Sequence, residues 1–381
     1  MSESTVADVS NAGAEPPGEP ARPEIRGGLV SDELAVAPDD VPTERIATTV
    51  RAIAEALHQS MQADESVVCL GEDIVGGAGL GPPLEGTMGG TFGATKSLFP
   101  AFGANRVRDT PISEAGFVGL SVGAALAGLR PVVDLMWMSF STLCFDQIFN
   151  QAAKARYMFG GQANVPAVFR AAMGAGSGCA GQHSDTLYSV YTHLPGLKVV
   201  VPSTPYDAKG LLISAIEDDD PVVFCEHMGL YNVRGPVPEE MYRVPLGVAR
   251  TLRRGKDVTV VAVGLMARRA LEAATQLESR GVDAEVVDPR TLSPLDEDTI
   301  LESVEKTGRL VVVDESHPRC SFATDVAALV ADRGFASLRA PVKRINGPHG
   351  PVPLSPILES AFLPSAEHIA DTVEALVSSS R

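Results

Sequence analysis

The chain has 381 residues, of which 45% are hydrophobic and 21% charged, a composition that is ordinary for globular proteins. Its length predicts two or three domains rather than one. The formal net charge of −17 repels nucleic acid and anionic membranes, and no lysine- or arginine-rich run offsets it, so neither is expected as a partner. The N-terminus has no charged start followed by an apolar core, so we expect no secretory signal.

The five cysteines are far apart in the sequence and form no C-x-x-C pair. This spacing disfavours both a disulfide framework and a zinc site, and it is typical of a soluble protein of the reducing cytoplasm. We expect the thiols to be small buried apolar groups. The cysteines are Cys69, Cys144, Cys179, Cys225 and Cys320.

Residues 1–42 differ from the rest of the chain. They contain six prolines, many acidic residues and no aromatic residue. Such a segment buries too little apolar surface to offset the entropy of ordering it. We predict a disordered tail without a catalytic role.

From residue 43 the sequence alternates between helical and strand patterns. Thr43 and Glu44, followed by apolar residues at helical spacing, predict a capped amphipathic helix. Because the apolar runs are continuous, we expect a parallel sheet covered by helices on both faces, in one doubly wound domain of residues 43–232. The expected strands are residues 66–70, 106–109, 131–135, 167–172, 198–202 and 222–226, and the further helices are 116–129, 145–158 and 207–217.

Residues 233–257 are polar and contain prolines and arginines, and we predict that they link two domains. The alternation then restarts, so residues 258–381 are predicted to form a second, smaller doubly wound domain, and the fold class is α/β. Its expected strands are residues 258–263, 284–287 and 309–314, and its helices are 267–280, 296–306 and 323–333.

Several long sequence blocks occur in one order along the chain. They are GED (71–73), RVRDTPISEAGFVGLSVGAALAGLRPV (106–132), FDQIFNQAAKARYMFGG (145–161), GQHSDTLYS (181–189), HLPGLKVVVPSTPYDAKGLL (193–212) and AIEDDDPVVF (215–224). With these blocks the chain resembles the β subunits of the E1 components of pyruvate, branched-chain 2-oxo acid and acetoin dehydrogenases. GGAG (76–79) and RYMFGG favour the acetoin-type members. The resemblance implies a pyrimidine-binding thiamine diphosphate domain followed by a transketolase C-terminal-like domain.

Glu114 lies between Ile112 and a stretch rich in alanine and glycine. The resemblance implies that it is catalytic and binds the cofactor, with its carboxyl group against N1′ of the aminopyrimidine of thiamine diphosphate. Proton sharing there favours the imino tautomer, whose nitrogen removes the proton from C2, and a dry apolar setting strengthens that sharing. The alternative is a glutamate that interacts with a helix dipole.

Met136 and Phe140 follow the strand expected at residues 131–135. The resemblance implies that both contact the aminopyrimidine, with Phe140 stacked on it. An aromatic face and a polarisable sulfur suit a flat heteroaromatic ring, although core is the commoner place for such residues. Trp137 is larger than the residue expected there, so it either alters the acyl pocket or faces the core.

His183 follows a loop, residues 174–181, that is rich in glycine and small residues and lets a backbone approach a ligand closely. The resemblance implies a catalytic role for His183 on the substrate side of the thiazolium, as a donor to the oxo acid or to the acyl group passed to lipoamide. Ser184 and Asp185 are candidates to orient the imidazole. The alternative is a structural histidine.

Three aspartates, 218–220, follow the helix expected at 207–217 and face the negative end of its dipole, an unfavourable arrangement that a bound cation would relieve. The resemblance implies a structural potassium ion held largely by backbone carbonyls. The alternative is a solvated acidic cap. The implied ligands are Ala167, Ala215, Ile216, Asp218 and Asp220.

The chain contains no G-D-G motif, with which enzymes of this class hold the diphosphate through Mg²⁺. The resemblance therefore implies that an α subunit supplies this end of the coenzyme, in an α₂β₂ heterotetramer that acylates lipoyl groups of an E2 acyltransferase. The substrate implied is a 2-oxo acid or acetoin. Two alternatives remain, a non-catalytic β-like scaffold and a self-contained transketolase-type enzyme.

Overall fold

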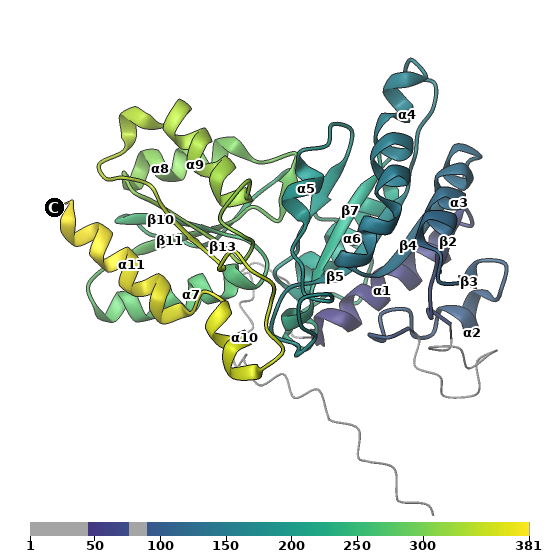
Figure 1. The fold of residues 1–381 in the computed structure, drawn as a ribbon, viewed down its shortest axis with the longest axis horizontal. Helices are drawn as coiled ribbons and strands as arrows, with labels where there is room; N and C mark the ends of the chain where they lie inside the picture. The colour runs from purple at the N-terminus through teal and green to yellow at the C-terminus, as the bar shows by residue number, and fades with distance from the viewer. Residues whose placement is uncertain (1–44, 76–89, 381) are drawn as a thin grey trace, which may run out of the picture.

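A computed structural model describes residues 45–75 and 90–380. Figure 1 shows two α/β domains side by side, with the helix α10 (Pro356–Phe362) below the junction between them. The predicted tail, the predicted cap at Thr43 and Glu44, and the GGAG sequence at 76–79 lie outside the described residues. No helix among the described residues is long and apolar enough to cross a membrane.

The first domain contains a seven-stranded sheet in the order β12-β6-β7-β5-β4-β2-β3. Its strands pair in parallel except for β12, which is antiparallel to β6. The sequence patterns located its six parallel strands to within two residues at each end. The strands are β2 (Val67–Gly71), β3 (Val107–Asp109), β4 (Arg130–Trp137), β5 (Val168–Met173), β6 (Lys198–Val200), β7 (Val222–His227) and β12 (Thr291–Ser293).

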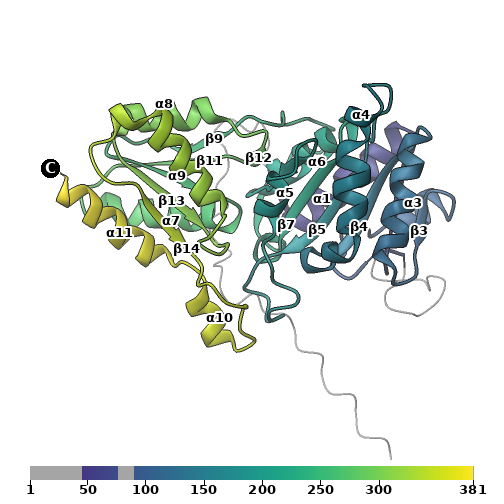
Figure 2. The ribbon, with the colours of Figure 1, turned by 45° about the horizontal axis from the view of Figure 1, so that its top comes forward.

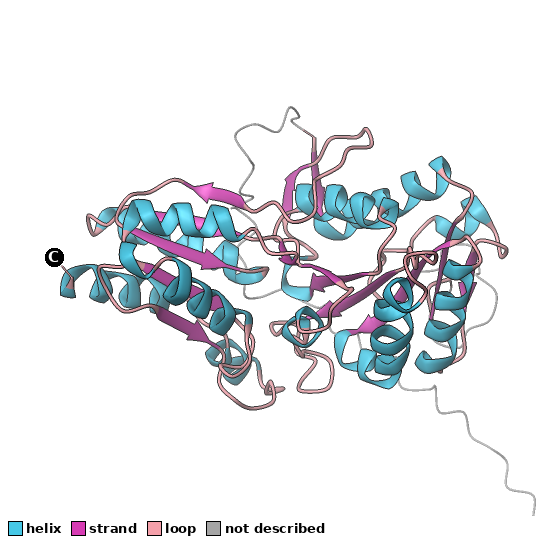
Figure 3. Ribbon diagram, turned by 90° about the horizontal axis from the view of Figure 1, so that it is seen from above, coloured by secondary structure: helices cyan, strands magenta, loops and turns pink. Residues whose placement is uncertain are grey.

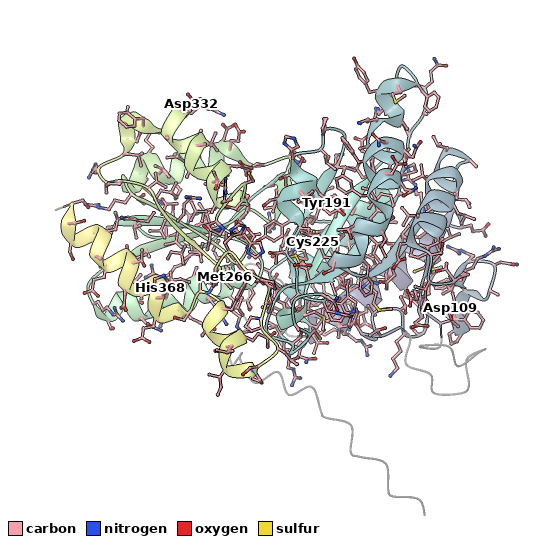
Figure 4. The ribbon with its side chains drawn as sticks, viewed as in Figure 1. Asp109, Tyr191, Cys225, Met266, Asp332 and His368 are labelled. Carbon is pink, nitrogen blue, oxygen red and sulfur yellow. The ribbon has the colours of Figure 1, made fainter. Side chains whose placement is uncertain are left out.

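Helices cover both faces of this sheet. The helices α1 (Thr49–Ala63) and α6 (Pro205–Glu217) pack together on one face, where they bury residues such as Leu57 and Leu212. The other face is covered by α3 (Glu114–Leu126), by α5 (Tyr188–Thr192) and by the consecutive helical turns of residues 138–158. Figure 4 labels Tyr191 and Cys225, which belong to the core on that second face.

Two helices differ from the sequence prediction. The first helix begins at Thr49, because the side chain of Thr48 accepts a hydrogen bond from the backbone N–H of Arg51 and caps it. A short strand, β1 (Ile46–Thr48), precedes it and pairs with β8 (Arg234–Pro236). The predicted helix 145–158 contains the π-helical turn η2 (Gln147–Ala152) followed by α4 (Ala153–Met158), and the 3₁₀ helix η1 (Met138–Cys144), which was not predicted, comes directly before it. The short helix α2 (Leu98–Phe102) was not predicted.

The second domain contains a five-stranded sheet in the order β14-β13-β10-β11-β9 (Figure 2). The helices α7 (Leu265–Ser279) and α11 (Ala366–Ser379) cover one face, and α8 (Glu297–Thr307) and α9 (Phe322–Arg333) cover the other. The strands are β9 (Arg250–Arg253), β10 (Val258–Ala262), β11 (Ala284–Asp288), β13 (Leu310–Asp314) and β14 (Lys343–Asn346).

The two domains are joined by more than a linker. Residues 233–257 contain β8, which pairs with β1, and β9, which pairs with β11. The strand β12, labelled between the two domains in Figure 2, pairs with β6 of the first sheet. Figure 3 shows the two domains from above. One hydrophobic cluster continues from the helices of the first domain to α8 and α9. The two domains therefore share part of their core.

Candidate functional site

Glu114 is the first residue of α3 and is only 6% exposed. The helix packs against η1, and the Glu114 carboxylate adds to the effect of burial in raising the pKa of the Cys144 thiol to about 12. Glu72 directly follows β2, and its pKa is raised by partial burial and by the nearby negative charges of Asp73 and Glu114. Among residues 45–75 and 90–380, no group donates a hydrogen bond to the Glu114 carboxylate or forms an ion pair with it. The carboxylate is therefore available to a group from outside these residues, such as solvent or a ligand.

Met136 lies at an irregular turn near the end of β4. Its φ is 60°, in the left-handed region that a residue with a side chain rarely adopts. The pairing with β5 shifts register between Asp134 and Trp137, and the Met136 N–H donates to Asp134 Oδ1 at 2.9 Å. Strained backbone of this kind is concentrated at ligand sites. The turn places the half-buried Met136 at the carboxyl end of the sheet.

Three rings meet after this turn. The His183 ring lies edge-on to Trp137, with centroids 5.0 Å apart, and edge-on to Phe140 at 5.3 Å. Trp137 also packs edge-on against Phe92 at 4.9 Å and is 6% exposed. The structure thus brings His183 and Phe140 together, and the largely buried Trp137 ring contacts both Phe92 and His183.

The residues that follow His183 do not orient its imidazole as expected. Asp185 accepts a hydrogen bond from Ser139 Oγ at 2.7 Å. The Ser184 hydroxyl is buried and has no hydrogen-bond partner among the described residues. The His183 ring packs against the rings of Trp137 and Phe140, and these aromatic contacts hold it in place.

The glycines before His183 serve the junction between the domains. Gly174 has a φ of 89°, and a Cβ there would lie 2.1 Å from Nε2 of His227. The backbone N–H groups of Gly176 and Gly178 donate to Glu359 Oε1, on α10, at 2.8 and 3.1 Å. The close approach that Gly174 permits is therefore to β7 of the same domain, whereas the hydrogen bonds of Gly176 and Gly178 reach the second domain.

A buried ion-pair cluster below the turn was missed from the sequence. Arg170, 1% exposed on β5, donates to Glu226 on β7 at 2.8 and 2.7 Å and to Asp134 on β4. We call Asp134, Arg170 and Glu226 the Arg170 cluster. A signal for it was present, because a charged residue interrupts the apolar run of each of three neighbouring strands. Charged residues in such strands are rare unless they are paired.

The acidic segment after α6 is paired with basic side chains. Asp218 accepts two hydrogen bonds from Lys198 Nζ, at 2.7 and 2.6 Å, and Asp220 accepts one from Arg156 at 2.6 Å. These cations offset the unfavourable interaction of the aspartates with the helix dipole.

The backbone oxygens expected to bind potassium also have partners. Arg130 Nη1 donates to the carbonyl oxygens of Ile216 and Asp218 at 3.1 and 2.9 Å. The carbonyl of Ala167 accepts from Val222 N–H at 2.9 Å within the sheet. Ala215 and Ile216 are buried at the end of α6.

The helix α3 lies on the outer side of the first domain (Figure 1) and packs against η1. Exposed apolar side chains occur just before α3, on α3 and on η1: Ile112 is 78% exposed, Leu120 64% and Leu143 61%. We call these three residues the α3 face. Large apolar side chains exposed on neighbouring elements are typical of a surface that another chain covers.

Comparison with known proteins agrees with this architecture. Residues 46–234 match the family described as the transketolase pyrimidine binding domain, and residues 247–369 match the transketolase C-terminal domain. The chain is 57% identical over 319 residues to the β subunit of acetoin:2,6-dichlorophenolindophenol oxidoreductase of Cupriavidus necator, with 84% of this chain and 94% of that protein covered.

Two relatives from Bacillus subtilis extend the comparison. Identity is 54% over 334 residues to the corresponding acetoin oxidoreductase β subunit, with 87% and 98% covered. It is 44% over 326 residues to the pyruvate dehydrogenase E1 component β subunit, with 85% and 97% covered. The chain belongs to this family of dehydrogenase E1 β subunits. The predicted family, the α/β fold and the class of enzyme are confirmed.

Solved structures share the fold of this E1 β-type chain. A protein described as a split gene transketolase, inactive β4 tetramer, aligns with a TM-score of 0.67 at 23% identity, over 87% of this chain and 99% of that one. A transketolase variant from Pichia stipitis aligns with a TM-score of 0.60 at 14% identity, over 90% and 48%. At these identities the likeness is one of fold alone.

Proposed function

We propose that this chain is the β subunit of an acetoin-cleaving E1 enzyme and provides the aminopyrimidine half of a thiamine diphosphate site. The observation that carries the proposal is Glu114, a residue that is only 6% exposed, has no hydrogen-bond or ion-pair partner among the described residues and begins a helix that bears exposed apolar side chains. A ring nitrogen that shares a proton would satisfy it.

The residues at this edge of the sheet suit the coenzyme. When bound, thiamine diphosphate supplies a nucleophilic carbon that adds to a carbonyl group and stabilises the electrons left by bond cleavage. Glu114 holds the proton at N1′, Phe140 offers a ring face to the pyrimidine, and Met136 offers a polarisable sulfur. His183 donates a hydrogen bond or a proton on the substrate side.

The partner of the α3 face is an α subunit. An apolar surface of this kind becomes stable when a second chain excludes water from it, and closure would also dry the surroundings of Glu114. The α subunit holds Mg²⁺ and the diphosphate, because this chain has no G-D-G motif. We propose an α₂β₂ enzyme of the cytoplasm that passes its two-carbon product to the lipoyl group of an E2 acyltransferase.

Acetoin is the substrate that we favour over pyruvate. Identity to the acetoin oxidoreductase subunits is 57% and 54%, against 44% for the pyruvate dehydrogenase subunit of Bacillus subtilis. Cleavage between the carbonyl and carbinol carbons releases acetaldehyde, and the remaining two-carbon unit is oxidised to acetyl as the lipoyl disulfide is reduced.

The potassium ion stays a prediction. It would be held by the carbonyl oxygens of Ala167, Ala215 and Ile216 and by Asp218 and Asp220. Since Arg130 and Lys198 engage several of these oxygens, an ion would have to displace or share their contacts. A thermal melt of the αβ complex that is the same in potassium and choline chloride would exclude the site.

The test is co-expression with the α subunit, followed by assays with acetoin, pyruvate and branched-chain 2-oxo acids. We expect the complex to bind thiamine diphosphate, to prefer acetoin, and to lose turnover when either subunit is omitted. A complex that assembles but binds no coenzyme would identify a scaffold instead. Turnover by this chain alone would identify a self-contained transketolase-type enzyme.

A further inference from the structure

The Arg170 cluster connects the three central strands at their carboxyl ends. In the sheet register Asp134 of β4 is directly opposite Arg170 of β5, and Glu226 of β7 is opposite Ala172. The Arg170 side chain is 2% exposed, so every charge in the cluster depends on its partners. The planar guanidinium can bind two carboxylates at once in a fixed geometry, which the point charge of a lysine cannot do.

One side of the cluster reaches the Met136 turn. Asp134 uses Oδ2 to pair with Arg170 and Oδ1 to accept the backbone N–H of Met136 at 2.9 Å. Gly71 lets β2 lie against Asp134, since a Cβ at Gly71 would be 2.8 Å from the Asp134 Cβ. This carboxylate therefore holds the turn whose φ of 60° aims Met136.

The other side reaches His183 through a series of rings. Glu226 Oε2 accepts a hydrogen bond from the Tyr231 hydroxyl at 2.6 Å. The Tyr231 ring lies 5.5 Å from that of Phe92, which packs on Trp137, and Trp137 in turn packs on His183. Each contact is edge-on or tilted, as aromatic rings prefer.

We propose that the Arg170 cluster is a positioning device for the coenzyme and substrate site, with one arm through Asp134 to Met136 and a second through Tyr231 to His183. The proposal rests on the proposed function. It predicts that the two arms are separable, so that coenzyme affinity depends on the first and substrate handling on the second.

The charges around Arg170 favour its ionised form. Burial alone would lower the pKa of Arg170, but Asp134 and Glu226 raise it well above its ordinary value. Burial and then Glu226 raise the pKa of Tyr231, so its hydroxyl stays a donor. Arg170 and Tyr231 therefore both remain hydrogen-bond donors to these carboxylates.

The first arm is tested with Asp134→Asn in the αβ complex. An asparagine has one acceptor oxygen, so it cannot serve both Arg170 and the Met136 N–H. We expect the dissociation constant of thiamine diphosphate to rise roughly tenfold or more. The matched control is Asp207→Asn. Asp207 is a buried carboxylate that pairs with Arg290 at an N–O distance of 2.8 Å, and it has no contact with the Met136 turn. The control substitution should lower the melting temperature and leave coenzyme affinity within about twofold.

The second arm is tested with Tyr231→Phe, which removes only the hydroxyl. We expect the KM for acetoin to change about threefold to tenfold, or the pH profile of kcat to shift. The affinity for the coenzyme should stay within about twofold of the wild-type value. Its control is Tyr188→Phe, which removes a buried hydroxyl bonded to Asp314 at the junction of the domains. That control should alter stability alone.

Arg170→Lys should change both coenzyme affinity and substrate handling. If it fails to assemble, the two single-arm variants still decide the matter. If the wild-type complex binds the coenzyme normally and each variant behaves like its control, the positioning role is wrong and the proposed function stands. A wild-type complex that binds no thiamine diphosphate would overturn both.

Discussion

The carboxyl ends of the two parallel sheets use their acidic side chains differently. In the second domain β11 ends at Asp288, which accepts a hydrogen bond from Ser203, and β13 ends at Asp314, which accepts one from Tyr188. Glu315 pairs with His227 of β7. All three acids are therefore bound to the first domain.

The first domain presents the contrast. Two acids on its strands, Asp134 and Glu226, neutralise Arg170, whereas Glu114 has no partner among the described residues. Doubly wound folds bind ligands beyond the carboxyl ends of their strands, but the second sheet uses its ends to attach a neighbouring domain. The same fold thus serves assembly in one domain and, under the function proposed above, chemistry in the other.

The largest effect is expected from Glu114→Gln. Glutamine keeps the shape of the side chain but cannot share a carboxyl proton, so turnover by the αβ complex should fall about 10²–10⁴-fold. The melting temperature should change little. The matched control is Glu367→Gln, in the first turn of α11, which removes a helix-dipole interaction without touching the site. Equal activity of the two variants would reduce Glu114 to a dipole partner.

The second prediction concerns Asp288, which lies at the junction of the domains. Burial, with the nearby Asp207, raises the pKa of Asp288 to about 7. The folded protein therefore holds this proton more tightly than the unfolded chain. The associated stability is complete below about pH 4 and is lost as the pH rises to about 7, with a slope of up to ~1.4 kcal/mol per pH unit.

Asp288→Asn should remove this pH dependence. The asparagine can still accept the Arg290 N–H, found at 3.0 Å, and can donate to Ser203 Oγ. We expect the variant to be more stable than wild type near pH 8 and no more stable near pH 5, as measured by urea unfolding. A constant difference across that range would mean that Asp288 is already ionised in the folded protein.

A third and smaller effect is expected from Glu359→Ala. The variant loses the acceptors of the Gly176 and Gly178 N–H groups, which costs about 1–3 kcal/mol. Amide hydrogen exchange in residues 174–178 should become faster, and turnover should fall because the same loop leads to His183. Glu359→Gln keeps one acceptor oxygen and serves as the control, with an intermediate or negligible change.

Much of the fold and of the candidate site could be predicted from the sequence. The alternation of apolar strands with helices predicted both sheets, and the blocks around Glu114, Met136, Phe140 and His183 predicted the residues of the candidate site. These features are local, since a strand or a helix start depends on residues that are close in the chain.

The missed features depend on register and tertiary packing. Asp134, Arg170 and Glu226 are far apart in the sequence and meet only because β4, β5 and β7 pair in one register. The three residues of β12 carry no signal that they return to the first sheet. The helical pattern of residues 145–158 does not distinguish α-helix from the single π-helical turn that η2 forms.

The smallest effect is expected from Trp137→Phe, which asks how far the aromatic edge of the first sheet controls substrate choice. Trp137 packs on His183 on one side and on Phe92 on the other, so a smaller ring leaves space beside the imidazole. Space for one further methylene group should raise kcat/KM for a longer 2-hydroxy ketone, relative to acetoin, by about threefold to tenfold. The control is Phe224→Leu. Phe224 is a fully buried residue of β7, and its replacement should lower the melting temperature without changing this ratio. An unchanged ratio for Trp137→Phe would place the ring in the core alone and assign substrate choice to the α subunit.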